Sequence, residues 1–504
     1  MTAFDGIGDA VVCSIALVAI LGASTSPAGA EPATGAAPLT SAGTGPSAYH
    51  VKMRSVAPPR LAITASLPID GRALEMETTR PAGIPELDDR GWPGLVSNLR
   101  VSDSTGRPVA VAPAGEAGWL LAEAHAGRLT VDYEVDYSPL AARGWPAPRE
   151  AALADSSHLV FIGRSMFITT RDVGSTIVTF ALPRRYRPVT PWEQSPGSAH
   201  EFAVGTKGGL VENIVVLTRS GPDVLNAGGF RLLVTPMGHW LPARKEVRRV
   251  LGAVMPRLVG LMGFEERENY LVVLLPVVDS GGESFRSSFA LTMDDPPSRA
   301  NSSTWGRLLA HEIFHYWNGG RLRGSDYVTS QWFQEGFTEY VANVSMVAAK
   351  LAGPEDFTRT LSDHVRNYRN LTTTLEAGGS PKGPPLYSGG ALVAFSWDVS
   401  IRHSTDGKRD LGDFLRALWQ LTERGERSCD WREIRAALEA TAPRDWDAYF
   451  RSYIRGDEPL PLDETLLLAG LLLEQAEDGT PRIKVNPEAS APSNSLWRAL
   501  VEGR

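Results

Sequence analysis

The feature that most constrains this chain is a run of thirty residues from His311 to Tyr340, HEIFHYWNGGRLRGSDYVTSQWFQEGFTEY. It begins with an H-E-x-x-H pattern, in which the histidines are His311 and His315 and the acid is Glu312. On a helix, two residues four apart lie on one face, with Cβ atoms roughly 5–6 Å apart. Both imidazoles can therefore bind one metal ion. Glu312 is then placed to act on a metal-bound water rather than to bind the metal.

A third ligand is expected from Glu335, twenty positions after His315, on a second helix that packs against the first. Two histidines and a glutamate are typical of catalytic zinc, with the fourth position open to water. Zinc lowers the pKa of that water from about 15.7 towards 7, so Glu312 can take its proton as the water attacks a carbonyl. The alternative is a surface helix with two incidental histidines. In that case Glu312 would be a lone charge among apolar neighbours, which costs free energy.

Glu339 lies four residues beyond Glu335, on the same face of the expected second helix. Two interpretations remain open for it. In the first, Glu339 accepts a hydrogen bond from the other ring nitrogen of a ligand histidine and so fixes the tautomer of that histidine. In the second, Glu339 is an acid on the surface of the helix, in contact with solvent.

The composition is ordinary for a soluble globular protein, with 43% hydrophobic and 21% charged residues. At 504 residues the chain is long enough for about two to four domains. The net charge of −8 argues against nucleic acid as the main partner.

The first thirty residues have the pattern of a secretory signal peptide. An apolar run of thirteen residues, Val11–Ala23, is too short to span a bilayer and leads into a small-residue site at Ala28–Ala30. We therefore expect a secreted or periplasmic protein with no stable membrane insertion after cleavage. Asp5 and Asp9 depart from the pattern, because no Lys or Arg precedes the apolar run. An uncleaved anchor, a simple leader and a different start codon stay open.

The rest of the chain predicts a multidomain α+β protein. Short apolar-polar alternations separated by turns indicate a β-sandwich-like domain, and later segments have helical periodicity. Within the first domain, Trp145–Ser157 is expected to form a loop or short helix. The predicted divisions are a signal peptide (1–30), a linker (31–48), an N-terminal β domain (49–220), a catalytic core (221–353), a helical lobe (354–458) and a C-terminal tail (459–504).

Within the catalytic core, NYLVVLLPVV from Asn269 reads as a buried strand, SGGES as a glycine-rich turn, and Phe285–Asp294 as a further strand at a possible sheet edge. The helix that carries the H-E-x-x-H pattern is expected to be capped by one of the residues 302–304 and to end at Gly319-Gly320.

Three stretches carry a family resemblance: HEIFHYWN, WFQEGFTEY and PPLYSGGALVAFSWDVSIRHSTDGKRDLGDFLRALW. Together they resemble the glycyl aminopeptidase family of gluzincin zinc metallopeptidases, from about Asn269 to Trp419. The resemblance implies a thermolysin-like catalytic domain and a peptide substrate. It also implies that Tyr387, from the Y-x-x-G-A-L-V run, points into the site and donates to the oxyanion of the tetrahedral intermediate.

The same resemblance is weaker at the substrate end of the site. Relatives carry a Gly-Leu-Glu-His-type run on an edge strand, where this chain has GGESFR from Gly281 to Arg286. Glu283 is the candidate for binding the free amine of a substrate, although the acid is displaced by one and Phe285 stands at the His position. Relatives often end in a PDZ module, and the tail after Pro459 is too short to hold a full one.

The sequence therefore predicts a zinc peptidase that hydrolyses peptide bonds with metal-activated water. The resemblance favours an aminopeptidase that acts on short peptides with small N-terminal residues. A zinc endopeptidase of the same fold and a non-catalytic peptide-binding protein are the alternatives. The oligomeric state is not indicated.

Overall fold

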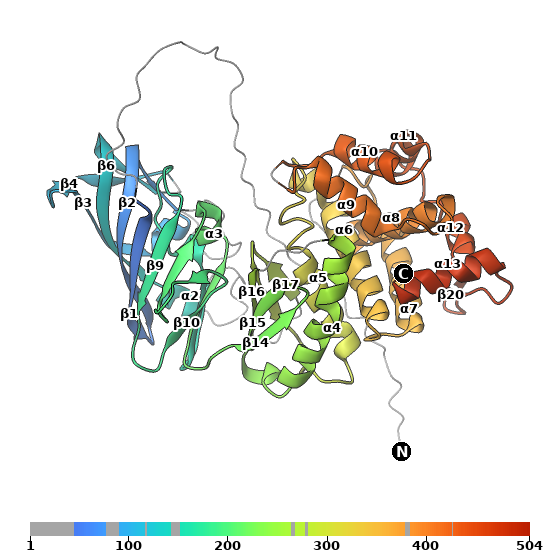
Figure 1. Ribbon diagram of the computed structural model, residues 1–504, viewed down its shortest axis with the longest axis horizontal. Helices are drawn as coiled ribbons and strands as arrows, with labels where there is room; N and C mark the ends of the chain where they lie inside the picture. Colours follow the sequence, from blue (N-terminus) through green and yellow to red (C-terminus); the bar gives the residue numbers. More distant parts are fainter. Residues whose placement is uncertain are drawn as a thin grey trace, which may run out of the picture.

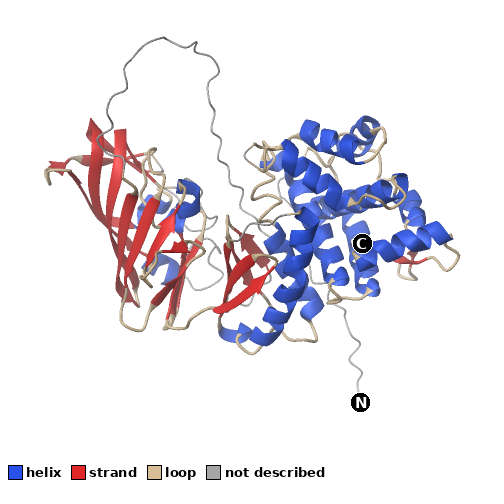
Figure 2. Ribbon diagram, viewed as in Figure 1, coloured by secondary structure: helices blue, strands red, loops and turns tan. Residues whose placement is uncertain are grey.

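The computed structural model describes residues 45–76, 90–115, 118–142, 152–263, 268–277, 281–377, 384–425 and 427–503. The chain forms a sheet-rich N-terminal domain, a central domain with a small sheet and helices, and a helical lobe, in that order along the long axis (Figures 1 and 2). The predicted multidomain α+β fold is confirmed. The predicted signal peptide lies outside the described residues.

The N-terminal domain contains two sheets that share one apolar core. In the larger sheet the order is β11-β12-β9-β1-β2-β6-β3-β4, with β5 paired to β6, and in the smaller it is β10-β13-β8-β7. Strand β1 alternates buried and exposed residues, as expected for a strand with one face on the core. The strands are β1 (Ser47–Val56), β2 (Pro59–Glu75), β3 (Val96–Asp103), β4 (Pro108–Val109), β5 (Val111–Ala114), β6 (Gly118–Asp136), β7 (Ala152–Ala154), β8 (His158–Ile162), β9 (Thr176–Ala181), β10 (Arg187–Val189), β11 (Glu193–Gln194), β12 (Glu201–Val204) and β13 (Ile214–Thr218). Two short helices, α2 (Ser138–Ala142) and α3 (Lys207–Val211), complete the domain.

The smaller sheet is buried on both faces and joins the N-terminal domain to the central one. Leu159 and Phe161 of β8 belong to the core shared with the large sheet. Val160 and Ile162, on the other face, pack in a second cluster with residues of the central sheet such as Leu271. This explains why HLVFI and IVVLT are continuous apolar runs without alternation.

The segment Trp145–Ser157 corrects one prediction. Its described part contains strand β7, where we expected a loop or short helix, and Leu153 of β7 pairs with Val160 of β8. The strand forms because a partner from later in the chain completes its hydrogen bonds. The two strands form a local hairpin, but the three residues of β7 are too few to show an alternation that predicts a strand.

The central domain is built on a five-stranded sheet with the order β14-β15-β16-β18-β17. Strands β15, β16 and β18 are parallel, β14 and β17 are antiparallel edges, and helix α4 crosses from β15 to β16. The elements are β14 (Asp223–Ala227), β15 (Phe230–Pro236), α4 (Arg244–Met262), β16 (Asn269–Leu274), β17 (Gly281–Ser284), β18 (Ser288–Thr292), α5 (Ser302–Phe314) and α6 (Tyr327–Ala348).

Two predictions about this domain are wrong in detail. The stretch GGES is not a turn but the edge strand β17, and the strand after it, β18, lies inside the sheet. Helix α5 starts at Ser302 behind Asn301, without a side-chain cap. It ends at Phe314, before Gly319, because Tyr316 and Trp317 bond to the carbonyls three residues back and tighten the last turn.

The C-terminal part is a helical lobe against which the tail packs. The hydroxyl of Ser362 in α7 accepts from the amide of Ile483 in β20, at 2.8 Å. Its elements are α7 (Pro354–Tyr368), α8 (Pro384–Ser404), α9 (Leu411–Leu421), α10 (Trp431–Thr441), α11 (Trp446–Tyr449), α12 (Leu462–Leu468), β19 (Leu471–Gln475), β20 (Pro481–Val485) and α13 (Ala491–Glu502). Within the described residues, none of these or the earlier helices has the length and apolarity needed to cross a membrane.

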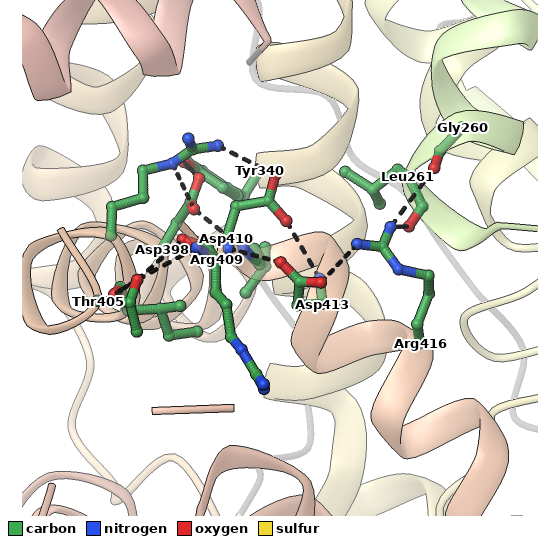
Figure 3. Close-up of polar contacts among 12 residues, drawn as sticks. Gly260, Leu261, Tyr340, Asp398, Thr405, Arg409, Asp410, Asp413 and Arg416 are labelled. Atoms are coloured by element: carbon green, nitrogen blue, oxygen red, sulfur yellow. Dashed lines mark hydrogen bonds and ion pairs between the residues drawn. The ribbon is translucent and has the colours of Figure 1, made fainter. Parts of the chain in front are cut away.

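A buried polar cluster fixes helix α6 to the lobe (Figure 3). The carboxylate of Asp398 in α8 accepts from the Tyr340 hydroxyl at 2.8 Å and from Arg402 Nε at 2.9 Å. It also accepts from the backbone amide of Leu411 at the start of α9, at 3.1 Å. Because Asp398 is buried, each of these bonds offsets the cost of desolvating its charge. Three helices are therefore held together just beyond the predicted ligand Glu335.

Candidate metal centre

Helix α5 presents the two predicted histidine ligands to one buried point. His311 and His315 are 0% and 6% exposed, and their Nε2 atoms lie 3.0 Å apart. His315 Nδ1 donates to the carbonyl of Asn318 at 2.8 Å. With the proton on Nδ1, Nε2 of a neutral imidazole carries a lone pair and is the atom available to a metal.

Helix α6 brings the third predicted ligand to the same point. Glu335 Oε2 lies 3.5 Å from His311 Nε2 and 3.4 Å from His315 Nε2. The three residues form the group able to hold a metal ion in the described part of the chain. Two lone pairs and a carboxylate that converge in a buried place repel one another unless a cation lies between them. The donors therefore fit a metal ion, and two imidazoles with one carboxylate suit zinc.

Tyr327 positions the carboxylate of Glu335. Its hydroxyl donates to Glu335 Oε1 at 3.2 Å, while Oε2 faces the histidines and is buried without a hydrogen-bond partner. One oxygen is thus held by protein and the other is left for a ligand bond. Such support of a ligand by its neighbours is common in metal sites.

Asn318, from the H-x-W-N run, fastens the two ligand helices together. Its carbonyl orients His315, and its side-chain amide donates to the carbonyls of Phe333 and Gln334 at 3.1 and 2.9 Å. Those carbonyls belong to α6, directly before Glu335. One buried side chain therefore sets the distance between the histidines and the glutamate.

Glu339 faces the other ring nitrogen of His311. Glu339 Oε1 lies 3.3 Å from His311 Nδ1, and Oε2 accepts from Arg307 Nη1 at 2.6 Å. Burial raises the pKa of this carboxyl, but the charges of Arg307, His311 and His364 together outweigh burial and hold the pKa below its ordinary value. An ionised carboxylate beside Nδ1 favours the tautomer that leaves His311 Nε2 free for the metal.

The predicted base, Glu312, is held by the edge strand β17. Its side chain is buried, and Ser284 Oγ donates to its Oε2 at 2.5 Å and to its carbonyl at 2.9 Å. Its Oε1 is buried without a hydrogen-bond partner. A Cβ at Gly282 would lie 2.0 Å from Oε1, so the strand can come this close to the carboxylate only because residue 282 is a glycine.

Tyr387 reaches the site from helix α8 because two glycines bring α8 against α6. A Cβ at Gly390 would lie 1.8 Å from the Trp332 carbonyl, and one at Gly336 would lie 2.4 Å from Gly390. Gly390 is almost one turn from Tyr387, and Gly336 follows Glu335. Burial and the nearby carboxylates of Glu335 and Glu312 raise the pKa of the Tyr387 hydroxyl far above its ordinary value. The phenol is therefore a hydrogen-bond donor at neutral pH.

Glu283 lies on the same strand but on its other face. Alternation along β17 puts Gly282 and Ser284 towards Glu312, and Glu283 away from it. Glu283 is buried, and Phe285, two residues on, packs under the guanidinium of Arg164 at 5.6 Å. The structure thus groups the two histidines and Glu335 with Glu312 and Tyr387, and places Phe285, on the Glu283 face of the strand, against Arg164 of the N-terminal domain.

Comparison with known proteins agrees with this geometry. Residues 305–376, which include most of α5, the following turn and all of α6, match the family model of the M61 glycyl aminopeptidases. The resemblance found in the sequence is confirmed. Together with the group of His311, His315 and Glu335, this match makes the chain a zinc metallopeptidase.

Solved structures share the fold of this metallopeptidase. An aminopeptidase N family protein from Idiomarina loihiensis aligns with a TM-score of 0.69 at 18% identity, over 86% of this chain and 81% of that one. The M1 zinc metallopeptidase from Deinococcus radiodurans aligns with a TM-score of 0.55 at 16% identity, over 82% and 94%. Yeast LTA4 hydrolase aligns with a TM-score of 0.51 at 14% identity, over 82% and 68%. A sequence comparison with curated proteins finds no match.

The sequence alone did not reveal the residues that hold the predicted site residues in place. Ser284 and Gly282 lie in the GGES stretch that was interpreted as a turn, and Tyr327 and Arg307 lie in the two ligand helices without a motif of their own. Only Asn318 had a local signal, through the H-x-W-N run.

Proposed function

We propose that this metallopeptidase is a zinc aminopeptidase that removes residues from the free N-terminus of short peptides. The observation that carries the proposal is the set His311, His315 and Glu335 with Glu312 and Tyr387 around it. When bound, zinc supplies a Lewis acid and lowers the pKa of a coordinated water to about 7.

In this proposal the protein side chains have separate tasks. Glu312 Oε1 accepts the proton of the attacking water and passes it to the leaving amine, while Ser284 keeps Oε2 in place. The Tyr387 hydroxyl, protonated at neutral pH, donates to the oxyanion of the tetrahedral intermediate. Glu339 and Tyr327 keep two ligands in the orientation that binding requires.

The preference for a peptide end is supported by the way the N-terminal domain docks at the end of β17. The amide of Arg286 donates to the Glu212 carbonyl at 3.0 Å, and the amide of Ser287 to Asn213 Oδ1 at 2.8 Å. The Ser288 hydroxyl accepts from the amide of Ile214 at 3.0 Å. An extended peptide lying along the edge of β17 would meet this wall after one strand length. A closed end favours an exopeptidase over an endopeptidase.

Glu283 is the residue we assign to the substrate amine. It lies in β17, next to the wall, and a carboxylate there would pair with a free α-ammonium group. Phe285 and Arg164 fill the space beside it, which supports a preference for small first residues such as glycine and alanine. A structure of the M1 zinc metallopeptidase from Deinococcus radiodurans contains a bound Tyr-Ser-Ala substrate, and a structure of a two-domain M1 zinc metallopeptidase contains bound L-arginine, so proteins of this fold bind peptides and amino acids.

The deciding experiment compares free and N-acetylated tripeptides that begin with glycine, alanine, leucine or phenylalanine. We expect release of the first residue from the free peptides, fastest for glycine and alanine, and no cleavage of the acetylated ones. Efficient cleavage of acetylated peptides would identify an endopeptidase. The Glu312→Gln protein is the control for contaminating peptidases, and peptide binding without turnover in both proteins would identify a non-catalytic binder.

We also propose export, on the strength of the apolar run and small-residue site before residue 31. N-terminal sequencing of the protein recovered outside the cytoplasm tests this, with a first residue near Glu31 as the expected result. Full-length protein confined to the cytoplasm would contradict it.

A further inference from the structure

A basic hollow lies on the N-terminal domain, where its lining residues reach the central sheet. The strands nearest to it are β10, β14 and β15, which lie close together in Figure 1. Its volume is about 870 Å³. Five arginines line it, and no Asp or Glu is among the described residues of its lining. They are Arg184, Arg185, Arg187, Arg219 and Arg231.

The arginines come together only in the fold. A turn closed by the Tyr186 amide and the Pro183 carbonyl, at 2.8 Å, exposes Arg184 and Arg185. Arg187 pairs in register with Thr218, so it lies beside Arg219 at the adjacent strand end. Arg231 enters from β15 of the central domain.

The positive charge of this hollow is not neutralised by the protein. Across the described ranges, none of the five arginines forms an ion pair. The nearest acid in sequence, Asp223, is paired with Arg244. Arg219 stacks on the ring of Tyr186 at 5.1 Å, which holds one guanidinium at the wall. Clustered like charges repel one another and destabilise a folded protein. Because the net charge of the chain is −8, this cluster of arginines does not reflect an overall excess of positive charge.

The lining also includes a buried ring nitrogen without a hydrogen-bond partner. His200 Nδ1 is buried and has no hydrogen-bond partner. Trp192 and Phe202 supply aromatic surface beside it. A concave site with several guanidinium forks, an imidazole and aromatic walls suits a compact, multiply charged anion better than a flat partner.

We propose that this hollow binds a phosphate-bearing ligand with two or more negative charges, through Arg187, Arg219 and Arg231. One guanidinium group can donate two parallel hydrogen bonds to two oxygens of a phosphate group. Several arginines together therefore suit phosphate better than a single carboxylate. Such a ligand is either a soluble polyphosphate compound or the headgroup of an anionic phospholipid. The site is separate from the metal centre, so binding does not require turnover.

The experiment uses the full-length protein and a matched pair of triple variants. In the test variant Arg187, Arg219 and Arg231 become Gln. In the control, Arg369, Arg451 and Arg482 become Gln; these are exposed, lie in the helical lobe and its tail, and form no ion pair in the described part of the chain. Both variants lose three positive charges, so only the location differs.

Calorimetric titration with tripolyphosphate and co-sedimentation with phosphatidylglycerol vesicles form the two arms, with phosphatidylcholine vesicles as the blank. We expect binding in at least one arm, weakened about tenfold for each arginine that contacts phosphate in the test variant and less than about twofold in the control. Tripolyphosphate binding assigns a soluble ligand, and vesicle binding alone assigns a headgroup. No binding in either arm, or equal losses in the two variants, would overturn the proposal. Peptidase activity and melting temperature verify that both variants are folded.

Discussion

The tight approach of β17 to Glu312, the proposed base, gives a sharp prediction for Gly282→Ala. The added Cβ would lie 2.0 Å from Glu312 Oε1, while an ordinary contact begins at 3.4 Å, so the carboxylate or the strand must move by about 1.4 Å. A misplacement of about 1 Å at a reacting group costs roughly 100-fold in rate. We therefore expect kcat/KM for an alanyl tripeptide to fall about 100-fold, with the zinc content unchanged because no ligand is touched.

The control for this substitution is Gly252→Ala in α4, where a Cβ meets no atom within 4 Å. It should leave activity unchanged and stabilise the helix by up to about 1 kcal/mol. A second test combines Gly282→Ala with Glu312→Gln: if the new methyl acts only through the base, it adds no further loss to a protein that lacks the base. Wild-type activity of Gly282→Ala would refute the position of Glu312 described here.

Three further substitutions test other parts of the site. Tyr327→Phe removes the donor to Glu335, and we expect zinc affinity to fall about 10- to 100-fold in a competition with a chelator. Tyr387→Phe should lower kcat about 100- to 1,000-fold with little change in KM for the same peptide, and an unchanged kcat would remove its oxyanion role. His364 is buried in α7, where its Nδ1 lies 3.1 Å from Ser388 Oγ. Burial lowers the pKa of His364 from 6.5 to about 4, so the unfolded chain takes up this proton first as the pH falls. The free energy of unfolding therefore has its full value above pH 6.5 and falls by about 3 kcal/mol between pH 6.5 and 4. His364→Asn should flatten this part of the pH-stability curve, measured by urea unfolding with excess zinc, and an unchanged curve would contradict the assignment.

The long, regular elements of the fold were predictable because their signals are local. Strand β1 alternates along its sequence, and α6 carries an uninterrupted helical segment from Tyr327 to Ala348. Strand β7 was not predictable, because its three residues become a strand only through pairing with β8. The end of α5 was placed at the wrong residue for a related reason. Glycine is a common helix terminator, but bonds within residues 313–317 end this helix five residues before Gly319.

The group of His311, His315 and Glu335 was visible from spacing alone, as was the proposed base Glu312, since one helical turn decides whether two histidines can share a metal. The groups that orient them were not visible. Tyr327 contacts Glu335 across two turns of α6, and Ser284 contacts Glu312 from a strand of the adjacent sheet. Serine and tyrosine are common residues, so a hydroxyl near a carboxylate becomes significant only when the fold shows the distance.

The glycines show how a single residue type misleads when only local structure is considered. The pair Gly281-Gly282 reads as a turn, yet it forms a strand whose second glycine gives room to Glu312. Gly390, in the middle of α8, should weaken a helix by roughly 1 kcal/mol, yet it lets α8 meet α6 beside Glu335. Gly390 faces the backbone of α6 and Gly282 faces the carboxylate of Glu312, so at either place a methyl group would separate parts that are in contact. A glycine within a few residues of a catalytic motif therefore predicts close packing at least as well as it predicts a turn.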